Sequence, residues 1–144
     1  MFSKSCEYGL RAIIYIAQQT NLNNKVSLMT ISEEINSPQA FTAKILQQLT
    51  RNNIVRSIKG PHGGFVIEPE KMQTKISEVV FLFDGDSIYN GCGLGLKQCD
   101  ANSPCPLHHK FIEIRNDLKT MLEKTTLEIL VNEMNDNDMV WLKR

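Results

Sequence analysis

The chain has 144 residues, of which 42% are hydrophobic and 22% charged, and its formal net charge is zero. This composition argues against intrinsic disorder, and the length fits one compact domain or one domain with an added dimerisation element. Charge is uneven: residues 1–67 hold seven basic and three acidic side chains, and residues 68–144 hold nine and thirteen. The basic first half is a modest indication of contact with phosphates, although a surface accident explains it almost as well.

The N-terminal segment predicts neither a targeting signal nor a membrane span. Glu7 and Arg11 interrupt its short apolar run, and no cleavage site of small residues follows. No apolar run approaches the roughly 20 residues that a membrane-spanning helix needs. We therefore expect a cytoplasmic protein with no membrane partner. In that compartment thiols stay reduced, so clustered cysteines indicate metal binding or redox chemistry.

The first half of the chain predicts a helix-turn-helix. Apolar residues recur at helical spacing over 5–19, and a short helix follows over 27–35 with Ser27 as its N-cap. A further helix is expected over 38–52, with Ser37 as N-cap. Its inward face would hold Phe41, Ile45, Leu46 and Leu49. Two helices joined by so tight a turn form a helix-turn-helix whose second helix reads DNA.

A hairpin is predicted directly after the helix-turn-helix. Two β-rich runs, 54–58 and 65–67, flank the glycine-rich turn 59–64. In this position a hairpin forms a wing. A short helix over 76–83 follows and ends near Gly85. The predicted fold class is mainly α with a small β wing: a winged helix-turn-helix followed by a long C-terminal dimerisation helix.

Polar and basic side chains on the second helix and the wing are candidates for DNA contact. Gln can bond adenine through two hydrogen bonds, and Thr can contact the methyl group of thymine. Wing side chains would reach the DNA backbone or the minor groove. Taken singly, each is explained equally well by solvent exposure. The candidates are Gln39, Thr42, Lys44 and Gln48 on the helix, and Arg56, Lys59 and His62 on the wing.

Three of the four cysteines lie in one segment rich in Gly, Asp, Asn and Pro. They precede a histidine with the spacing Cys92-x6-Cys99-x5-Cys105-x2-His108. Such a loop suits buried structural thiols poorly, whereas thiolates and imidazole are ligands of iron–sulfur clusters and zinc. Zinc sites usually draw on Cys-x2-Cys pairs, which are absent here, so a cluster is favoured. Cys6 is expected to be a partly buried helix residue.

A long helix is predicted from roughly Leu107 to Asn132. Its apolar stripe needs a partner that the short remaining chain hardly supplies, so a dimer seam is the better interpretation. The stripe consists of Phe111, Ile114, Leu118, Met121 and Leu122. The chain thus divides into a winged-helix DNA-binding domain (1–85), a cysteine-rich cluster-binding loop (86–106), and a dimerisation helix with its tail (107–144).

The segment 49–65 resembles the signature of the Rrf-two family of bacterial winged-helix regulators, with the sequence LTRNNIVRSIKGPHGGF. The three-cysteine loop resembles the iron–sulfur branch of that family, and the resemblance extends to TTLEILV at 125–131. It implies a homodimer that crosses its long C-terminal helices and binds a near-palindromic operator in double-stranded DNA. It also implies a [2Fe–2S] or [4Fe–4S] cluster that tunes DNA affinity.

The resemblance also implies which residues hold the cluster. Cys92, Cys99 and Cys105 match the cluster thiolates, and His108 matches the histidine that completes the site. Glu7 lies where some members supply an acidic ligand from the partner's first helix, so it is the alternative fourth ligand. For His108, His109 and Glu7 alike, the competing interpretation is a solvated residue at the start of a helix. The first cysteine interval is one residue longer than in typical members.

The sequence therefore predicts a dimeric repressor whose operator binding is controlled by a cluster that senses redox state, nitric oxide or iron–sulfur supply. The alternative is a zinc or thiol-switch redox protein that uses its winged helix for protein–protein contact. We do not expect an enzyme, because no Ser/His/Asp arrangement, phosphate loop or HExxH motif is apparent.

Overall fold

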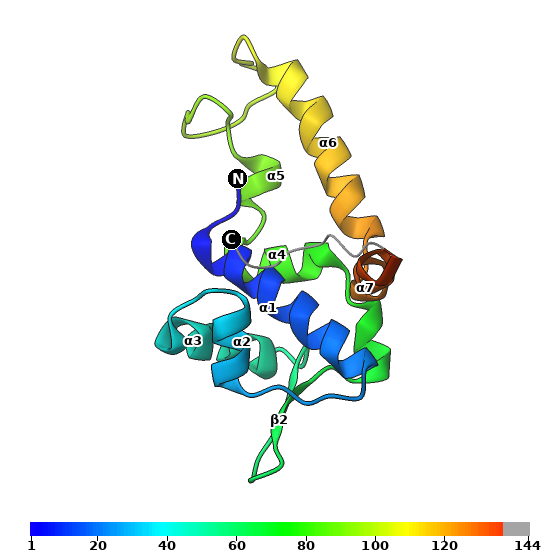
Figure 1. Ribbon diagram of the computed structural model, residues 1–144. Coiled ribbons are helices and arrows are strands. Elements are labelled where there is room, and N and C mark those ends of the chain that lie inside the picture. Colours follow the sequence, from blue (N-terminus) through cyan, green and yellow to red (C-terminus); the bar gives the residue numbers. More distant parts are fainter. Residues whose placement is uncertain (137–144) are drawn as a thin grey trace.

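The structure, a computed structural model, describes residues 1–136 (Figure 1). The predicted tail over 137–144 lies outside the described residues. In chain order the elements are α1 (Lys4–Asn21), α2 (Leu28–Glu34), α3 (Gln39–Arg51), β1 (Arg56–Ile58), β2 (Gly64–Val66), the 3₁₀ helix η1 (Pro69–Gln73), α4 (Ile76–Asp84), α5 (Ser87–Asn90), α6 (His108–Lys124) and α7 (Leu127–Asp136). The helix-turn-helix and wing are present as predicted.

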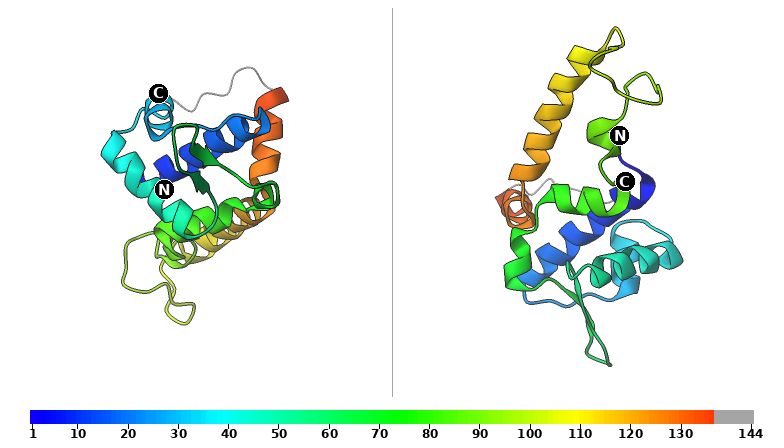
Figure 2. Two further views of the ribbon diagram at one scale, coloured as in Figure 1. Left: turned by 90° about the horizontal axis from the view of Figure 1, so that it is seen from below. Right: turned by 180° about the vertical axis from the view of Figure 1, so that it is seen from behind.

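Helix α1 lies at the centre of the core. Its buried residues Ala12, Ile13, Ile16 and Ala17 face α3, α4 and α7, which pack around it (Figures 1 and 2). At Gly9 the backbone approaches α4 so closely that a Cβ atom would collide with the ring of Phe83. The smallest residue therefore sets the distance between these two helices.

The helix-turn-helix forms as expected, with one correction at its second helix. Ser27 caps α2 by accepting a hydrogen bond from the Thr30 N–H at 3.1 Å. The predicted N-cap of α3, Ser37, is wrong: Pro38 occupies that position with ψ of 134°, and the helix begins at Gln39. The extended backbone of Pro38 moves the start by one residue, so the Ser37 hydroxyl is buried without a hydrogen-bond partner among the described residues.

The wing is an antiparallel pair tied to the segment before α2. Ser57 of β1 pairs with Phe65 of β2. Phe65 also exchanges backbone hydrogen bonds with Val26, at 2.8 and 3.3 Å. Gly64 has φ of 152°, and a Cβ there would collide with the Val26 backbone, so this position requires glycine. The wing is therefore fixed at its base, and Lys25 also donates to the His62 carbonyl in its turn at 3.2 Å.

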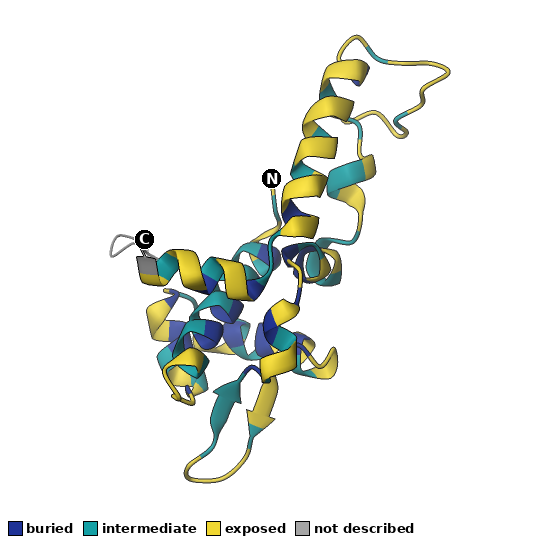
Figure 3. Ribbon diagram, turned by 90° about the vertical axis from the view of Figure 1, so that its right-hand side faces the viewer, coloured by how far each residue is buried: buried dark blue, intermediate teal, exposed yellow. Residues whose placement is uncertain are grey.

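The single long C-terminal helix predicted from the sequence is wrong. Helix α6 ends at Lys124, and Thr125 takes an extended conformation with ψ of 121°. The Thr125 carbonyl accepts from the Ile76 N–H at 2.9 Å, and the Leu127 N–H donates to the Thr74 carbonyl at 3.1 Å. These bonds to the start of α4 replace helical bonds. Figure 1 and Figure 3 show the result: α6 projects from the body, and α7 turns back beside α1.

The predicted apolar stripe lies wholly on α6, before this break, and its residues are divided between two faces of that helix. Leu122 is buried, and Leu118 packs beside the core. Ile114 and Met121 lie on another face of α6 and are 62% and 55% exposed. No helix among the described residues combines the length and apolar content that a membrane span requires.

The burial of α7 generates a stability prediction. Leu127 is fully buried at the start of α7, so Leu127→Ala should lower the free energy of unfolding by about 2–5 kcal/mol through lost burial and a cavity. Urea denaturation followed by circular dichroism measures this. Asn132→Ala, at an exposed position of the same helix, should change it by less than about 0.5 kcal/mol. Equal effects of the two variants would contradict the docking of α7.

Candidate DNA-binding surface and cysteine loop

A groove of about 560 Å³ lies between α2, α3 and the wing. Its apolar floor is formed in part by Leu28, Leu46 and Phe65, and exposed basic side chains stand along it. These are Lys44, Arg51 and Lys59. A row of cations between a recognition helix and a wing is suited to the phosphates of a duplex.

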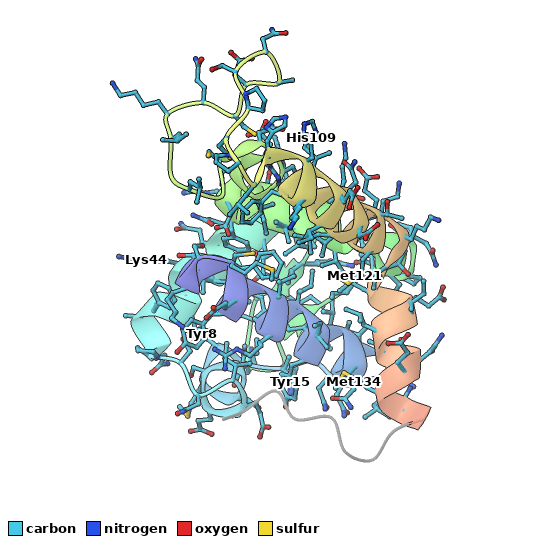
Figure 4. The ribbon with its side chains drawn as sticks, turned by 90° about the horizontal axis from the view of Figure 1, so that it is seen from above. Tyr8, Tyr15, Lys44, His109, Met121 and Met134 are labelled. Atoms are coloured by element: carbon cyan, nitrogen blue, oxygen red, sulfur yellow. The ribbon has the colours of Figure 1, made fainter. Side chains whose placement is uncertain are left out.

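Most of the predicted DNA-contacting residues are exposed, and Lys44 and Lys59 among them line this groove. Gln39, Lys44 and Gln48 are exposed on α3, and His62 and Lys59 are exposed on the wing. Figure 4 labels Lys44 at the edge of α3. These residues remain candidates for DNA contact.

Two predicted residues are less available. Thr42 is fully buried, and its hydroxyl donates to the Pro38 carbonyl at 3.1 Å, so its assignment as a base-contacting residue is wrong. It shares the inward face of α3 with Ile45 and Leu49, which are three and seven residues further on. Arg56 is exposed, but its guanidinium forms an ion pair with Glu68 at 2.5 Å, which partly neutralises the charge that a phosphate would meet.

Sequence reasoning missed Gln47, Arg51 and Ser57, which also line the groove. Lys44, Gln47 and Arg51 lie at spacings of three and four residues, which places them on one face of a helix. Helical periodicity alone could therefore have found the two missed residues on α3. Ser57 faces the groove because of the register of the hairpin, which the sequence did not define.

The cysteine loop spans the residues between α5 and α6. Cys92, Cys99 and Cys105 are all free thiols and are partly exposed. His108 is the first residue of α6 and is buried, at 4% exposure, contrary to the picture of a solvated histidine. Its Nδ1 lies 3.3 Å from the Sγ of Cys99, nine residues away. The structure thus places one of the predicted cysteine ligands in contact with the predicted histidine ligand.

The environment of each thiol differs. The pKa of Cys92 lies below its ordinary value because the backbone N–H groups of Leu94 and Leu96 stabilise the thiolate, with further contributions from Cys105 and Arg115. Burial, followed by the nearby carboxylate of Asp84, raises the pKa of Cys6 to about 12. At neutral pH Cys6 is therefore a protonated core thiol, whereas Cys92 has the character of a ligand or nucleophile.

Three thiols and an imidazole match the chemistry of an iron–sulfur or zinc site. The Nε2 of His108 is buried with no hydrogen-bond partner among the described residues, which is unusual for a polar atom and leaves it free to bind a group. Within residues 1–136, however, no three side chains of Cys, His, Asp or Glu already stand together as a metal site. The donor set fits such a group, but the loop would have to gather it.

The two other candidate ligands are Glu7 and His109. Glu7 is on α1 and pairs with Lys4 at 2.7 Å, and the hydrogen bond from Lys4 lowers its pKa. His109 is exposed, and its ring meets that of His108 edge-on at 5.3 Å between centroids; Figure 4 labels it at the loop end of α6. Neither belongs to a group of three metal-ligating side chains within residues 1–136.

Comparison with known proteins agrees with the fold and surface described above. Residues 2–133 match the family model of Rrf2, described as an iron-dependent transcriptional regulator. The chain therefore belongs to the Rrf2 family, the family that its wing and cysteine loop resemble. It is a winged-helix transcription regulator of a family that binds DNA, and it is not an enzyme, as expected from the sequence.

Individual relatives cover nearly the whole chain. A protein of Aquifex aeolicus (strain VF5), which carries the name of an HTH-type transcriptional regulator, is 31% identical over 92% of both chains. Among solved structures, T. potens IscR has a TM-score of 0.73 at 19% identity and covers 97% of this chain and 92% of its own. CymR of B. subtilis, the global cysteine regulator of that organism, has a TM-score of 0.72 at 23% identity and covers 92% of this chain and 97% of its own.

The basic groove generates a prediction for DNA binding. Lys59→Ala should weaken binding to a mixed-sequence duplex and reduce the slope of log K against log salt by about 0.9, because one phosphate contact is lost. Fluorescence anisotropy from low to moderate salt measures this slope. Lys119→Ala, an exposed lysine on α6, should leave it unchanged. An unaltered slope for Lys59→Ala would remove the wing from the DNA-binding surface.

Proposed function

We propose that this chain is a homodimeric repressor that binds a near-palindromic operator through α3 and the wing. In this proposal Cys92, Cys99, Cys105 and His108 hold an iron–sulfur cluster that controls operator binding. The contact between the Cys99 thiol and the buried imidazole of His108 carries the proposal, because it joins a loop thiol to the first residue of α6. A bound cluster would supply a centre that changes with electrons, oxygen, nitric oxide or iron supply.

The chain's own residues favour a cluster over a structural zinc site. The three thiols are partly exposed on a loop with few regular elements, so they can be reached by iron, sulfide and oxidants. Stable zinc sites are closed and mostly combine closely spaced ligand pairs. The family description as iron-dependent supports the same reading. A histidine or carboxylate ligand in place of a fourth thiolate would leave the cluster more easily attacked, as a sensor requires.

A thiol switch is the second candidate function, and one observation favours it. Cys105 contributes to the lowered pKa of Cys92, so these two thiols are near neighbours. A two-electron oxidant such as hydrogen peroxide would form a Cys92–Cys105 disulfide: the two thiols lose two protons and two electrons, and the peroxide is reduced to two molecules of water. In this case the loop would respond without any cofactor.

The exposed apolar face of α6 supports the homodimer. Ile114 and Met121 lie seven residues apart on one side of α6, Leu107 immediately before the helix continues the same spacing, and all three are exposed. The projection of α6 away from the core leaves this side open (Figure 3). A second α6 would cover it, and the two recognition helices would then be held at a fixed spacing, as two half-sites of an operator demand.

The proposed cluster predicts the colour of the protein. Protein purified without oxygen should absorb broadly in the violet and blue, and Cys92→Ala, Cys99→Ala and Cys105→Ala should each lose this absorption and the response of operator binding. The fold should remain, because these side chains lie outside the core. His108→Ala should alter the spectrum or make it fade faster, whereas its neighbour variant His109→Ala should not.

The other outcomes separate the alternatives. Colourless protein with one equivalent of zinc would contradict the cluster. Colourless, metal-free protein that loses two mass units between Cys92 and Cys105 on oxidation would support the thiol switch. A full operator response in all three cysteine variants would contradict both proposals.

The proposed dimer predicts that a charge in its seam lowers the mass of the particle in solution from that of a dimer toward that of a monomer. Ile114→Glu should shift the protein toward monomer, because a charge would be buried in the apolar seam. Sedimentation velocity at micromolar concentration measures the change. Thr120→Glu, an exposed position on another side of α6, should remain dimeric. If Ile114→Glu sediments as the unchanged protein does, the seam lies elsewhere.

A further inference from the structure

Arg115 connects the cysteine loop to α6 at several points. It lies seven residues after His108, and its Nε donates to the Phe111 carbonyl at 3.2 Å, which holds the side chain along its own helix. Its Nη1 donates to the carbonyl oxygens of Tyr89, at 3.3 Å, and Gly91. Its Nη2 donates to the Sγ of Cys99 at 3.4 Å. One guanidinium thus contacts both ends of the segment 89–99.

The positive charge of Arg115 strengthens these hydrogen bonds. Arg115 takes part in none of the ion pairs among the residues that the structure describes. Its hydrogen-bond acceptors are carbonyl oxygens and one sulfur. Hydrogen bonds from a charged donor are stronger than neutral ones, and the side chain is partly buried. The planar guanidinium reaches several acceptors in fixed directions, which the single ammonium of a lysine does not.

A second contact brings the same segment to the same face of α6. A Cβ at Gly93 would overlap with the ring of Phe111, so the loop backbone there lies directly on the ring. His108, Phe111 and Arg115 are separated by three and four residues and therefore share one face of α6. All three meet the loop, at Cys99, Gly93 and the carbonyl oxygens respectively.

We propose that Arg115 is the positioning residue of the cysteine loop and fixes the segment 89–99 on α6 independently of any bound group. A residue of α6, the helix that would form the dimer seam, then determines how well the segment 89–99 is ordered. A group that binds Cys99 would compete with Arg115 for the sulfur of that residue. Binding of the group in the loop would therefore change the contact between the loop and α6. This last consequence rests on the proposed function, whereas the positioning role does not.

Two lysines make the positioning role measurable in metal-free protein. Lys97 lies in the loop and Lys59 in the wing, and both are exposed. Limited digestion of the full chain with a lysine-specific protease, followed by mass spectrometry, gives the ratio of cleavage after Lys97 to cleavage after Lys59. Because cleavage follows the population of the opened segment, this ratio reports local opening of the loop. General unfolding would raise both rates together.

We expect Arg115→Gln and Arg115→Lys each to raise the ratio by roughly tenfold or more, because both variants lose the fork that binds several acceptors. Lys119→Gln, which removes an exposed charge from the same helix, should leave the ratio unchanged. A ratio within about twofold of the unchanged protein in both Arg115 variants, or an equal rise in Lys119→Gln, would overturn the proposal.

Folding of the variants is checked with Cys6. This thiol is fully buried, so it resists alkylation in the folded protein and becomes labelled on unfolding. If Arg115→Gln unfolds, Arg115→Lys decides the question, since it keeps the charge and the aliphatic stem on the same face. No DNA or metal is used, so a negative result here and a colourless protein are separate outcomes that contradict separate proposals.

Discussion

The extended conformation at Thr125 is the constraint on which the rest of the molecule depends. An uninterrupted helix would carry Leu127 and Val131 away from the body, although both are fully buried beside α1. Hydrogen bonds of Thr125 and Leu127 with Ile76 and Thr74, around the start of α4, satisfy backbone groups that the helix loses there. The chain can therefore place α7 in the core and still send α6 outward.

The projection of α6 separates the proposed DNA-binding surface from the cysteine loop. The wing and the cysteine loop lie at opposite ends of the molecule in Figure 1 and in the right-hand view of Figure 2. A change at the loop cannot reach a DNA-facing side chain by direct contact. Any influence has to pass through packed elements, and α6 is the element that holds both the loop at its first residue, His108, and the core at Leu122.

The tight packing of α1 against α4 forms a rigid unit between the cysteine loop and the DNA-binding surface. Gly9 lies against Phe83, and beside it the ring of Tyr8 meets that of Phe41 on the recognition helix edge-on, with 5.5 Å between centroids. A displacement of α6 would act on α4 and α1 together, since close-packed elements do not deform independently. In a dimer, a small shift of this unit changes the spacing of two recognition helices, and about 1.4 kcal/mol is enough for a tenfold change in affinity.

The sequence by itself determined most of the local elements and singled out the candidate ligands of the loop. Periodicity defined α1 to α4, glycine placement defined the wing, and cysteine spacing identified the loop, because each signal depends on neighbouring residues. Only the tertiary structure decided what depends on distant partners. Thr42 is buried because of what covers its face of α3, and the helix breaks at Thr125 because α4 offers hydrogen bonds. Likewise, Cys99 meets His108 and Arg115 because the loop folds back onto α6, which no local pattern encodes.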